Sequence, residues 1–187
     1  MPLALHRLHA LAFALVAAVC LLLAAPARGL GVELTAFQVQ RQDGALTLDF
    51  AVKLALPKAV EDALQRGVPI YFVAQAELYR PRWYWRDDRL SRVARSWRIA
   101  FQPLTNTWRV GLGGLNQSHA SLEEALSAVS RGVRWRLADL AQIEGDKGLY
   151  LEFSYRLDTS QLPGPMQIGL TPQAPWTMGI ERVLRLD

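Results

Sequence analysis

The chain has 187 residues, of which 51% are hydrophobic, and its formal net charge at pH 7 is +4. A charge this small excludes the strongly basic surface of most nucleic-acid-binding proteins. The only cysteine is Cys20, so the chain that follows it can form neither disulfides nor thiolate metal sites. Its stability must come from a packed core.

The first thirty residues have the features of a secretory signal peptide. A weakly basic start precedes the uncharged apolar run at residues 10–25, and Ala25-Pro26-Ala27 offers small residues for cleavage. The run is shorter than the roughly 20 residues that a membrane span needs. We therefore expect residues 1–29 to be removed, leaving one exported, mainly-β domain at residues 30–187.

Alternating apolar residues on both sides of Asp43-Gly44 predict the first hairpin. Residues 46–56 are apolar at every second position, which is the period of a half-buried strand. Asp43-Gly44 readily takes the positive φ values of a type I′ turn. A loop of these two residues sets a register that pairs Phe37 with Phe50 and Val39 with Leu48.

Two short amphipathic helices are predicted. The first begins at Pro57 and ends near Gly67, with apolar residues at three- and four-residue steps. The second runs over residues 122–131, where Ser121 and Glu124 have the spacing of a capping box. Both must pack on a sheet, because isolated helices below about 12 residues are marginally stable.

The apolar pattern between these helices predicts two long strands, at residues 70–82 and 91–103, with a turn at Asp87-Asp88. A tight loop at Leu104-Thr105 then begins a hairpin. Its register pairs Phe101 with Trp108, Ile99 with Val110 and Trp97 with Leu112, which places all six apolar side chains on one face.

The C-terminal third is predicted to add further strands. Residues 133–143 and 149–158 are expected to pair as a hairpin around residues 145–148, and short extended segments at 166–170 and 176–186 close the chain. Seven or eight strands joined mostly by hairpins predict a mainly β fold with two short helices. We expect an antiparallel β-sandwich or an open barrel.

The stretch YRPRWYWRDDRLSRVARSWR, at residues 79–98, is rich in arginine and aromatic residues. One interpretation is ordinary surface, in which guanidinium groups stack on the rings and pair with Asp87, Asp88 or Glu77. The other is a recognition site for a carboxylate, a phosphate or an acidic partner surface. Arg95 shares the parity of the apolar positions, so it must pair, reach the sheet edge or face a cavity. The predicted binding residues are Arg80, Arg82, Trp83, Trp85, Arg86 and Arg89.

No motif of catalysis or metal binding stands out. His119 is the only histidine after the leader, and neither a nucleophile motif nor a set of acids with metal-ligand spacing surrounds it. Asp87 and Asp88 could be paired acids of a glycosidase, but adjacent turn residues usually point apart. The sequence predicts no catalytic residue, no metal site and no cofactor.

Three segments of the chain carry a resemblance to a known family: Arg80-Pro81-Arg82-Trp83-Tyr84-Trp85, residues 108–126 and residues 156–163. Together they resemble an uncharacterised proteobacterial family, domain of unknown function 4390. The resemblance implies an exported, periplasmic protein without an assigned activity. By gene association it also implies a partner, the sensory domain of a membrane sensor histidine kinase.

The function that these observations favour is that of a non-enzymatic periplasmic binding or interaction domain. Its expected partner is a protein or an anionic envelope component, with no nucleic acid, and with membrane contact only through the leader if that stays uncleaved. The alternatives are a carboxylate-based envelope hydrolase and a structural envelope component.

Overall fold

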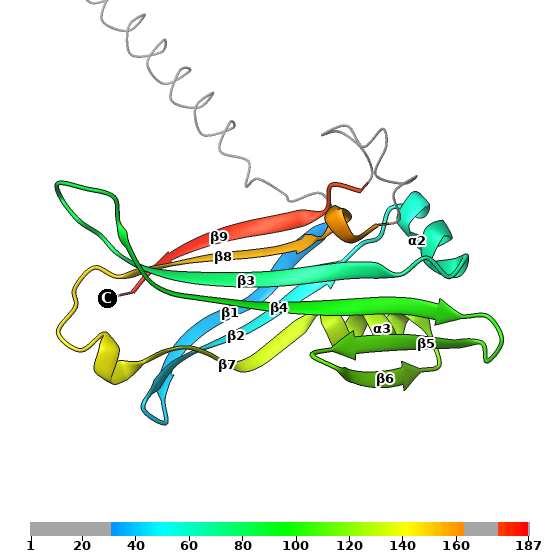
Figure 1. The fold of residues 1–187 in the computed structure, drawn as a ribbon, viewed down its shortest axis with the longest axis horizontal. Helices are drawn as coiled ribbons and strands as arrows, with labels where there is room; N and C mark the ends of the chain where they lie inside the picture. Colours follow the sequence, from blue (N-terminus) through cyan, green and yellow to red (C-terminus); the bar gives the residue numbers. More distant parts are fainter. Residues whose placement is uncertain (1–30, 163–175, 187) are drawn as a thin grey trace, which may run out of the picture.

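The computed structural model describes residues 31–162 and 176–186, so the predicted signal peptide and the predicted strand at 166–170 lie outside the described residues. Within these ranges the chain forms nine strands in two antiparallel sheets, together with two α-helices (Figure 1). The predicted mainly β, antiparallel fold is confirmed. The two sheets pack face to face as a sandwich.

The smaller sheet has the strand order β1-β2-β7, with β1 at Val32–Gln42, β2 at Ala45–Leu54 and β7 at Arg131–Asp139. Asp43 and Gly44 have φ values of 52° and 71°, as a type I′ turn requires. The predicted register is confirmed, because Phe37 lies opposite Phe50 and Val39 lies opposite Leu48.

The larger sheet has the strand order β6-β5-β4-β3-β8-β9. The predicted register of β4 and β5 is also confirmed, with Trp97, Ile99 and Phe101 opposite Leu112, Val110 and Trp108. The strands are β3 (Ile70–Arg80), β4 (Asp88–Gln102), β5 (Thr107–Leu112), β6 (Leu115–His119), β8 (Tyr150–Leu157) and β9 (Gly179–Arg185).

Helix α2 (Lys58–Gln65) and helix α3 (Leu122–Val129) lie close to the predicted positions. Pro57 is the N-cap of α2 and not its first helical residue. Ser121 caps α3, since its hydroxyl oxygen accepts the backbone N–H of Glu124 at 3.1 Å. Helix α3 packs against β5, β6 and β7, and in the part of the chain described here no helix is long and apolar enough to span a bilayer.

The predicted hairpin of residues 133–143 and 149–158 is wrong. Strand β7 pairs with β2 in the small sheet, and β8 pairs with β3 and β9 in the large one. After β7 the chain stays beside the tip of the first hairpin, where the Leu140 N–H donates to the Gly44 carbonyl at 2.9 Å. It then forms the 3₁₀ turn Leu140–Gln142 and crosses to the other sheet. Alternating apolar residues mark a strand but do not identify its neighbour.

Strand β6 was not predicted, because four of its five residues are exposed and its centre is polar. The signal for it was the pair Gly113-Gly114 between Leu112 and Leu115. Both glycines have positive φ, and Leu112 lies opposite Leu115 across this two-residue turn.

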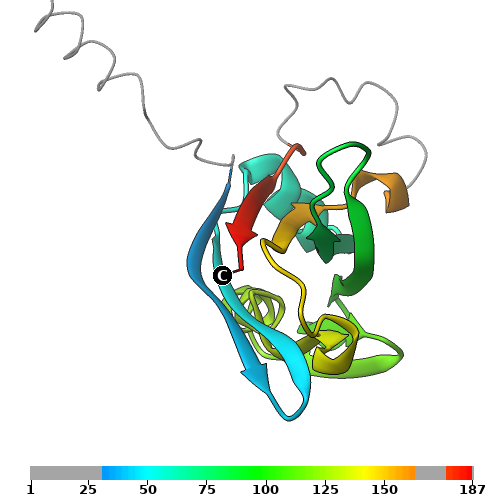
Figure 2. The same ribbon diagram turned by 90° about the vertical axis from the view of Figure 1, so that its left-hand side faces the viewer.

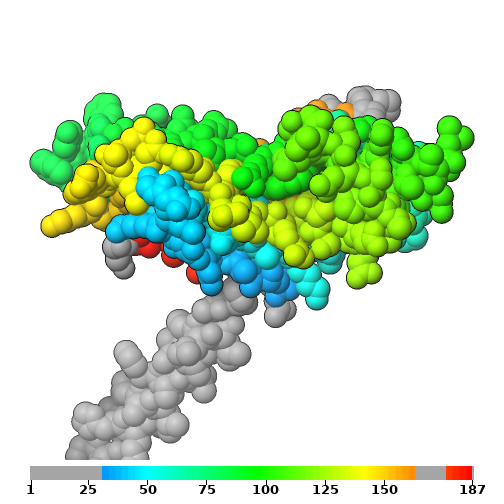
Figure 3. Space-filling model, turned by 90° about the horizontal axis from the view of Figure 1, so that it is seen from below, coloured from blue at the N-terminus to red at the C-terminus, as the bar shows by residue number. Residues whose placement is uncertain are grey.

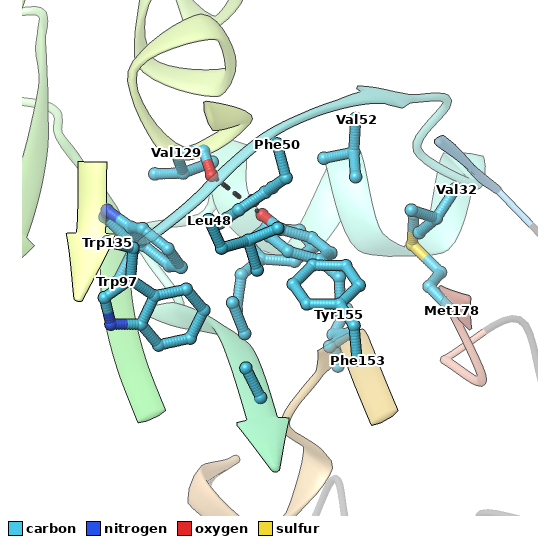
Figure 4. Packing of buried hydrophobic residues seen from close by; sticks show 14 of the residues in the cluster. Val32, Leu48, Phe50, Val52, Trp97, Val129, Trp135, Phe153, Tyr155 and Met178 are labelled. Atoms are coloured by element: carbon cyan, nitrogen blue, oxygen red, sulfur yellow. Dashed lines mark hydrogen bonds between the residues drawn. The ribbon is translucent and has the colours of Figure 1, made fainter. Parts of the chain in front are cut away.

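The core fills the space between the two sheets. Phe50 of β2 lies at its centre, and its ring centroid is 4.9 to 6.4 Å from the rings of Trp97, Trp135, Phe153 and Tyr155 (Figure 4). The buried Tyr155 hydroxyl donates to the Val129 carbonyl at 3.1 Å, at the C-terminal end of α3. This bond joins the helix to the large sheet.

Candidate functional site

The β3–β4 loop, residues 81–87, extends past the end of the large sheet (Figure 1). Seen end-on in Figure 2, it lies on the opposite side of the molecule from the β1–β2 hairpin. Strand β3 ends at Arg80 rather than at residue 82, and the next residue is Pro81, which has no N–H to continue the ladder. The aromatic residues therefore belong to the loop and not to a strand.

The tip of this loop carries three adjacent aromatic side chains that are largely exposed. Trp83 is 93% exposed, Tyr84 is 66% exposed and Trp85 is 74% exposed. The rings of Trp83 and Tyr84 meet edge to face at 5.1 Å. Elsewhere in the described ranges, the exposed large apolar side chains are Leu104, Leu115, Val133 and Val183, which belong to separate elements. The tip is thus the place where exposed large apolar side chains gather in the described part of the chain.

Arginines hold the base of the loop through acidic side chains. Arg80 pairs with Asp146 at 2.5 Å and with Asp88 at 3.6 Å. Arg82 pairs with Asp88 at 2.8 Å, and its backbone N–H donates to a carboxylate oxygen of Asp87 at 3.1 Å. Ion pairs therefore connect Arg80 and Arg82, at the start of the loop, with Asp88, at its end. The Arg80–Asp146 pair also connects the base of the loop with the segment before β8.

A tyrosine from β8 completes this base. The Tyr150 hydroxyl donates to Asp87 at 2.6 Å, and the Tyr150 ring stacks on Tyr79 with centroids 5.2 Å apart. The pKa of Asp87 lies below its ordinary value because its carboxylate accepts this bond and the Arg82 N–H. The same bond raises the pKa of Tyr150. The hydrogen bond between Tyr150 and Asp87 is thus most favourable when the carboxylate is charged and the phenol is neutral.

Glu77 is the one charged side chain that is buried among the described residues, and it organises the adjoining face of the sheet. It pairs with Arg92 at 3.0 Å and with Arg89 at 3.5 Å. It also accepts hydrogen bonds from Gln75 and from the hydroxyl of Tyr79, and the latter bond raises the pKa of Tyr79. Arg89 is therefore part of an ion-pair network.

The structure divides the six predicted site residues into two groups. The base group is engaged by carboxylates: Arg80, Arg82 and Arg89. The tip group is exposed: Trp83, Trp85 and Arg86. Across residues 31–162 and 176–186, Arg86 forms no ion pair. The base group therefore has the ion pairs that the ordinary-surface interpretation expects, and the recognition site stays a prediction for the tip group.

Arg95 lies away from this surface, on the inner face of β4. Its guanidinium carbon lies 5.2 Å from the ring centre of Trp135 in the opposite sheet. Desolvation lowers its pKa. Three outcomes were expected for Arg95, namely a partner, the sheet edge or a cavity, and the structure shows a partner, the Trp135 ring.

Two hollows on the surface of the described residues lie outside the loop. A shallow groove of about 260 Å³ on the outer face of β3, β8 and β9 is lined by Glu77, Glu152 and Glu181. A second hollow of about 490 Å³ lies where Arg41 and Gly44 of the β1–β2 hairpin approach residues 140–146. Figure 3 shows these two segments side by side at one end of the molecule. No group of three or more His, Cys, Asp or Glu side chains that could hold a metal ion occurs in the described ranges.

The residues that the sequence analysis considered for catalysis, Asp87 with Asp88 and His119, do not form a reactive cluster. Asp87 binds Tyr150 and the Arg82 N–H, whereas Asp88 binds arginines, so the two acids do not converge on one site. His119 is half-buried at the end of β6, beside Trp108 of β5. The sequence did not single out Tyr150 and Asp146, because a position next to the loop depends on the crossing between the sheets.

Fold and surface together define a two-sheet antiparallel β protein with a projecting loop of aromatic and arginine residues. The chain belongs to the family described as domain of unknown function (DUF4390), whose sequence model matches residues 30–184. This confirms the resemblance drawn from the three sequence segments. No curated protein and no solved structure matches the chain.

Proposed function

We propose that the protein is an exported, non-enzymatic interaction domain that contacts its partner through the β3–β4 loop. The partner is a protein or an anionic component of the cell envelope. The observation that carries this proposal is the exposure of Trp83, Tyr84 and Trp85 at the tip of the loop. Tryptophan, tyrosine and arginine are the residues in which binding energy concentrates at interfaces.

The energy available at this tip supports a binding role. A buried tryptophan covers about 150 to 250 Å² of surface. At about 25 cal/mol per Å², covering one exposed indole contributes roughly 4 to 6 kcal/mol before the costs of association. A solvent-facing position gives the protein none of this energy. Trp83 and Trp85 are therefore explained better by contact with a partner than by folding.

The base of the loop supports the same role. Arg80, Arg82 and Asp87 are held by partners on β4, β8 and the segment before β8. A loop that is fixed before binding loses little conformational entropy when it docks, so more of the contact energy appears as affinity.

The proposed location is the periplasm, supported by the leader-like composition of residues 1–29. The kinase association implied by the family resemblance makes the periplasmic sensory domain of a membrane sensor kinase one protein partner to test.

A carboxylate-based hydrolase is the alternative that a specific feature favours, namely the groove lined by Glu77, Glu152 and Glu181. Glu77, however, already accepts bonds from two arginines, a glutamine and a tyrosine. Glu152 and Glu181 are exposed on an open face. The groove thus offers no shielded pair of acids, and we place binding first.

The test is affinity capture from envelope extracts with the wild type and with Trp83→Ala/Arg86→Ala. The matched control is Leu104→Ala/Arg109→Ala, which removes an exposed apolar residue and an exposed arginine from the other end of the same sheet. We expect the first variant to lower recovery of a partner at least about tenfold and the control to leave it unchanged. Equal recovery with all three proteins would remove the loop from the contact surface.

A further inference from the structure

The β3–β4 loop projects past the end of the large sheet as a convex tip (Figures 1 and 2). Its three aromatic side chains, those of Trp83, Tyr84 and Trp85, are largely exposed. A convex tip offers a protein partner little contact area unless that partner has a matching pocket. The headgroup layer of a bilayer can instead close around each side chain. Tryptophan and tyrosine favour this layer, because the apolar ring enters the hydrocarbon boundary while the N–H or O–H stays hydrated.

The acidic side chains Asp87 and Asp88 are engaged at the base of the loop, whereas the cationic side chain of Arg86 is exposed at its tip. Asp87 is engaged by Tyr150 and Asp88 by Arg80 and Arg82, all at the base of the loop. Arg86 is exposed at the tip and has no acidic partner in the described part of the chain. Phosphate groups match the fork of a guanidinium, and an anionic lipid surface attracts it at a distance.

We propose that residues 83–86 insert into the headgroup layer of a bilayer that contains anionic lipids. This inference rests on the proposed function, because it names the anionic envelope component that the loop binds. The sequence predicts membrane contact only through an uncleaved leader. The projecting tip gives the folded domain a contact of its own.

The experiment measures binding of the protein, as its host processes it, to vesicles of phosphatidylcholine alone and of phosphatidylcholine mixed with phosphatidylglycerol. The proteins compared are the wild type, Trp83→Ala/Trp85→Ala, Arg86→Gln and the control Leu104→Ala. Near-ultraviolet circular dichroism from the buried Trp97, Trp108 and Trp135 verifies that each variant is folded.

We expect the wild type to bind the anionic vesicles, with its tryptophan emission shifted to shorter wavelength. Trp83→Ala/Trp85→Ala should bind at least about tenfold more weakly, since it loses the apolar area that inserts. Arg86→Gln should lose roughly fivefold on anionic vesicles and nothing on neutral ones. Leu104→Ala should bind as the wild type does.

The inference is overturned if the wild type does not bind vesicles, or if the folded tryptophan variant binds as well as the wild type does. Vesicle binding can fail while capture of an envelope protein still depends on Trp83 and Arg86. In that case the partner is a protein, and the proposed function stands without the lipid contact. Failure of both experiments would remove both proposals.

Discussion

Tyr155→Phe tests whether one buried hydrogen bond fastens helix α3 to the large sheet. Tyr155 is fully buried, and its hydroxyl donates to the Val129 carbonyl at 3.1 Å. That carbonyl belongs to the last turn of α3, where carbonyls lack partners within the helix. The substitution deletes the donor and leaves the acceptor buried. A lost bond costs about 0.5 to 1.5 kcal/mol and an unsatisfied buried carbonyl about 1 to 3 kcal/mol, so we expect a loss near 2 kcal/mol.

The assay is unfolding by denaturant and by heat. The midpoint denaturant concentration should fall while the m-value stays constant, and Tm should fall by roughly 4 to 8 °C for a chain of this size. The control is Tyr84→Phe, which removes the same atom from a ring that is 66% exposed. If both variants unfold within about 0.5 kcal/mol of the wild type, the bond does not stabilise the attachment of the helix.

Three further predictions concern the core and the base of the loop. Gly132→Ala should lower the free energy of unfolding by about 1 to 3 kcal/mol, measured by denaturant titration, because its Cβ would lie 2.4 Å from the Phe50 ring. Glu77→Gln should cost about 1 to 3 kcal/mol, whereas Glu152→Gln on the neighbouring strand should stay within about 0.5 kcal/mol. By NMR, Asp87 should titrate below the ordinary value of about 3.9. The hydrogen bond from Tyr150 to the Asp87 carboxylate is therefore fully formed at a pH above about 3.9. It is lost as the pH falls through the lowered pKa of Asp87. Tyr150→Phe should move the titration of Asp87 upward, and an unchanged midpoint would contradict the assignment.

Local hairpins could be predicted because several sequence features agreed on one register. Asp43-Gly44 fixed the turn that the apolar alternation of Phe37 and Phe50 also required. Around Leu104 three consecutive apolar pairs all fitted one register, and the structure has that register. The separation into two sheets could not be predicted in this way. The alternation around Trp135 is compatible with any apolar neighbour, and only the three-dimensional packing selects β2.

The candidate site could be predicted in composition but not in arrangement. Residues 80–89 stood out by their arginine and aromatic content, yet exposure depends on where β3 ends. Glu77 has the parity of a solvent-facing residue, but the side chains of Tyr79, Arg89 and Arg92 cover it. Long neighbouring side chains cause this burial of Glu77. The alternation of apolar and polar residues along a strand does not indicate it.

The tip of the β3–β4 loop is the surface by which we propose that this domain makes contact in the cell envelope. Photocrosslinking in living cells tests it directly, with benzoylphenylalanine placed at position 83 and, as the control, at position 104 in the β4–β5 loop. The two positions are exposed to 93% and 102% and lie in loops at opposite ends of the large sheet. We expect lipid or protein adducts from position 83 and none from position 104. Equal labelling from both positions, or labelling from position 104 alone, would contradict it.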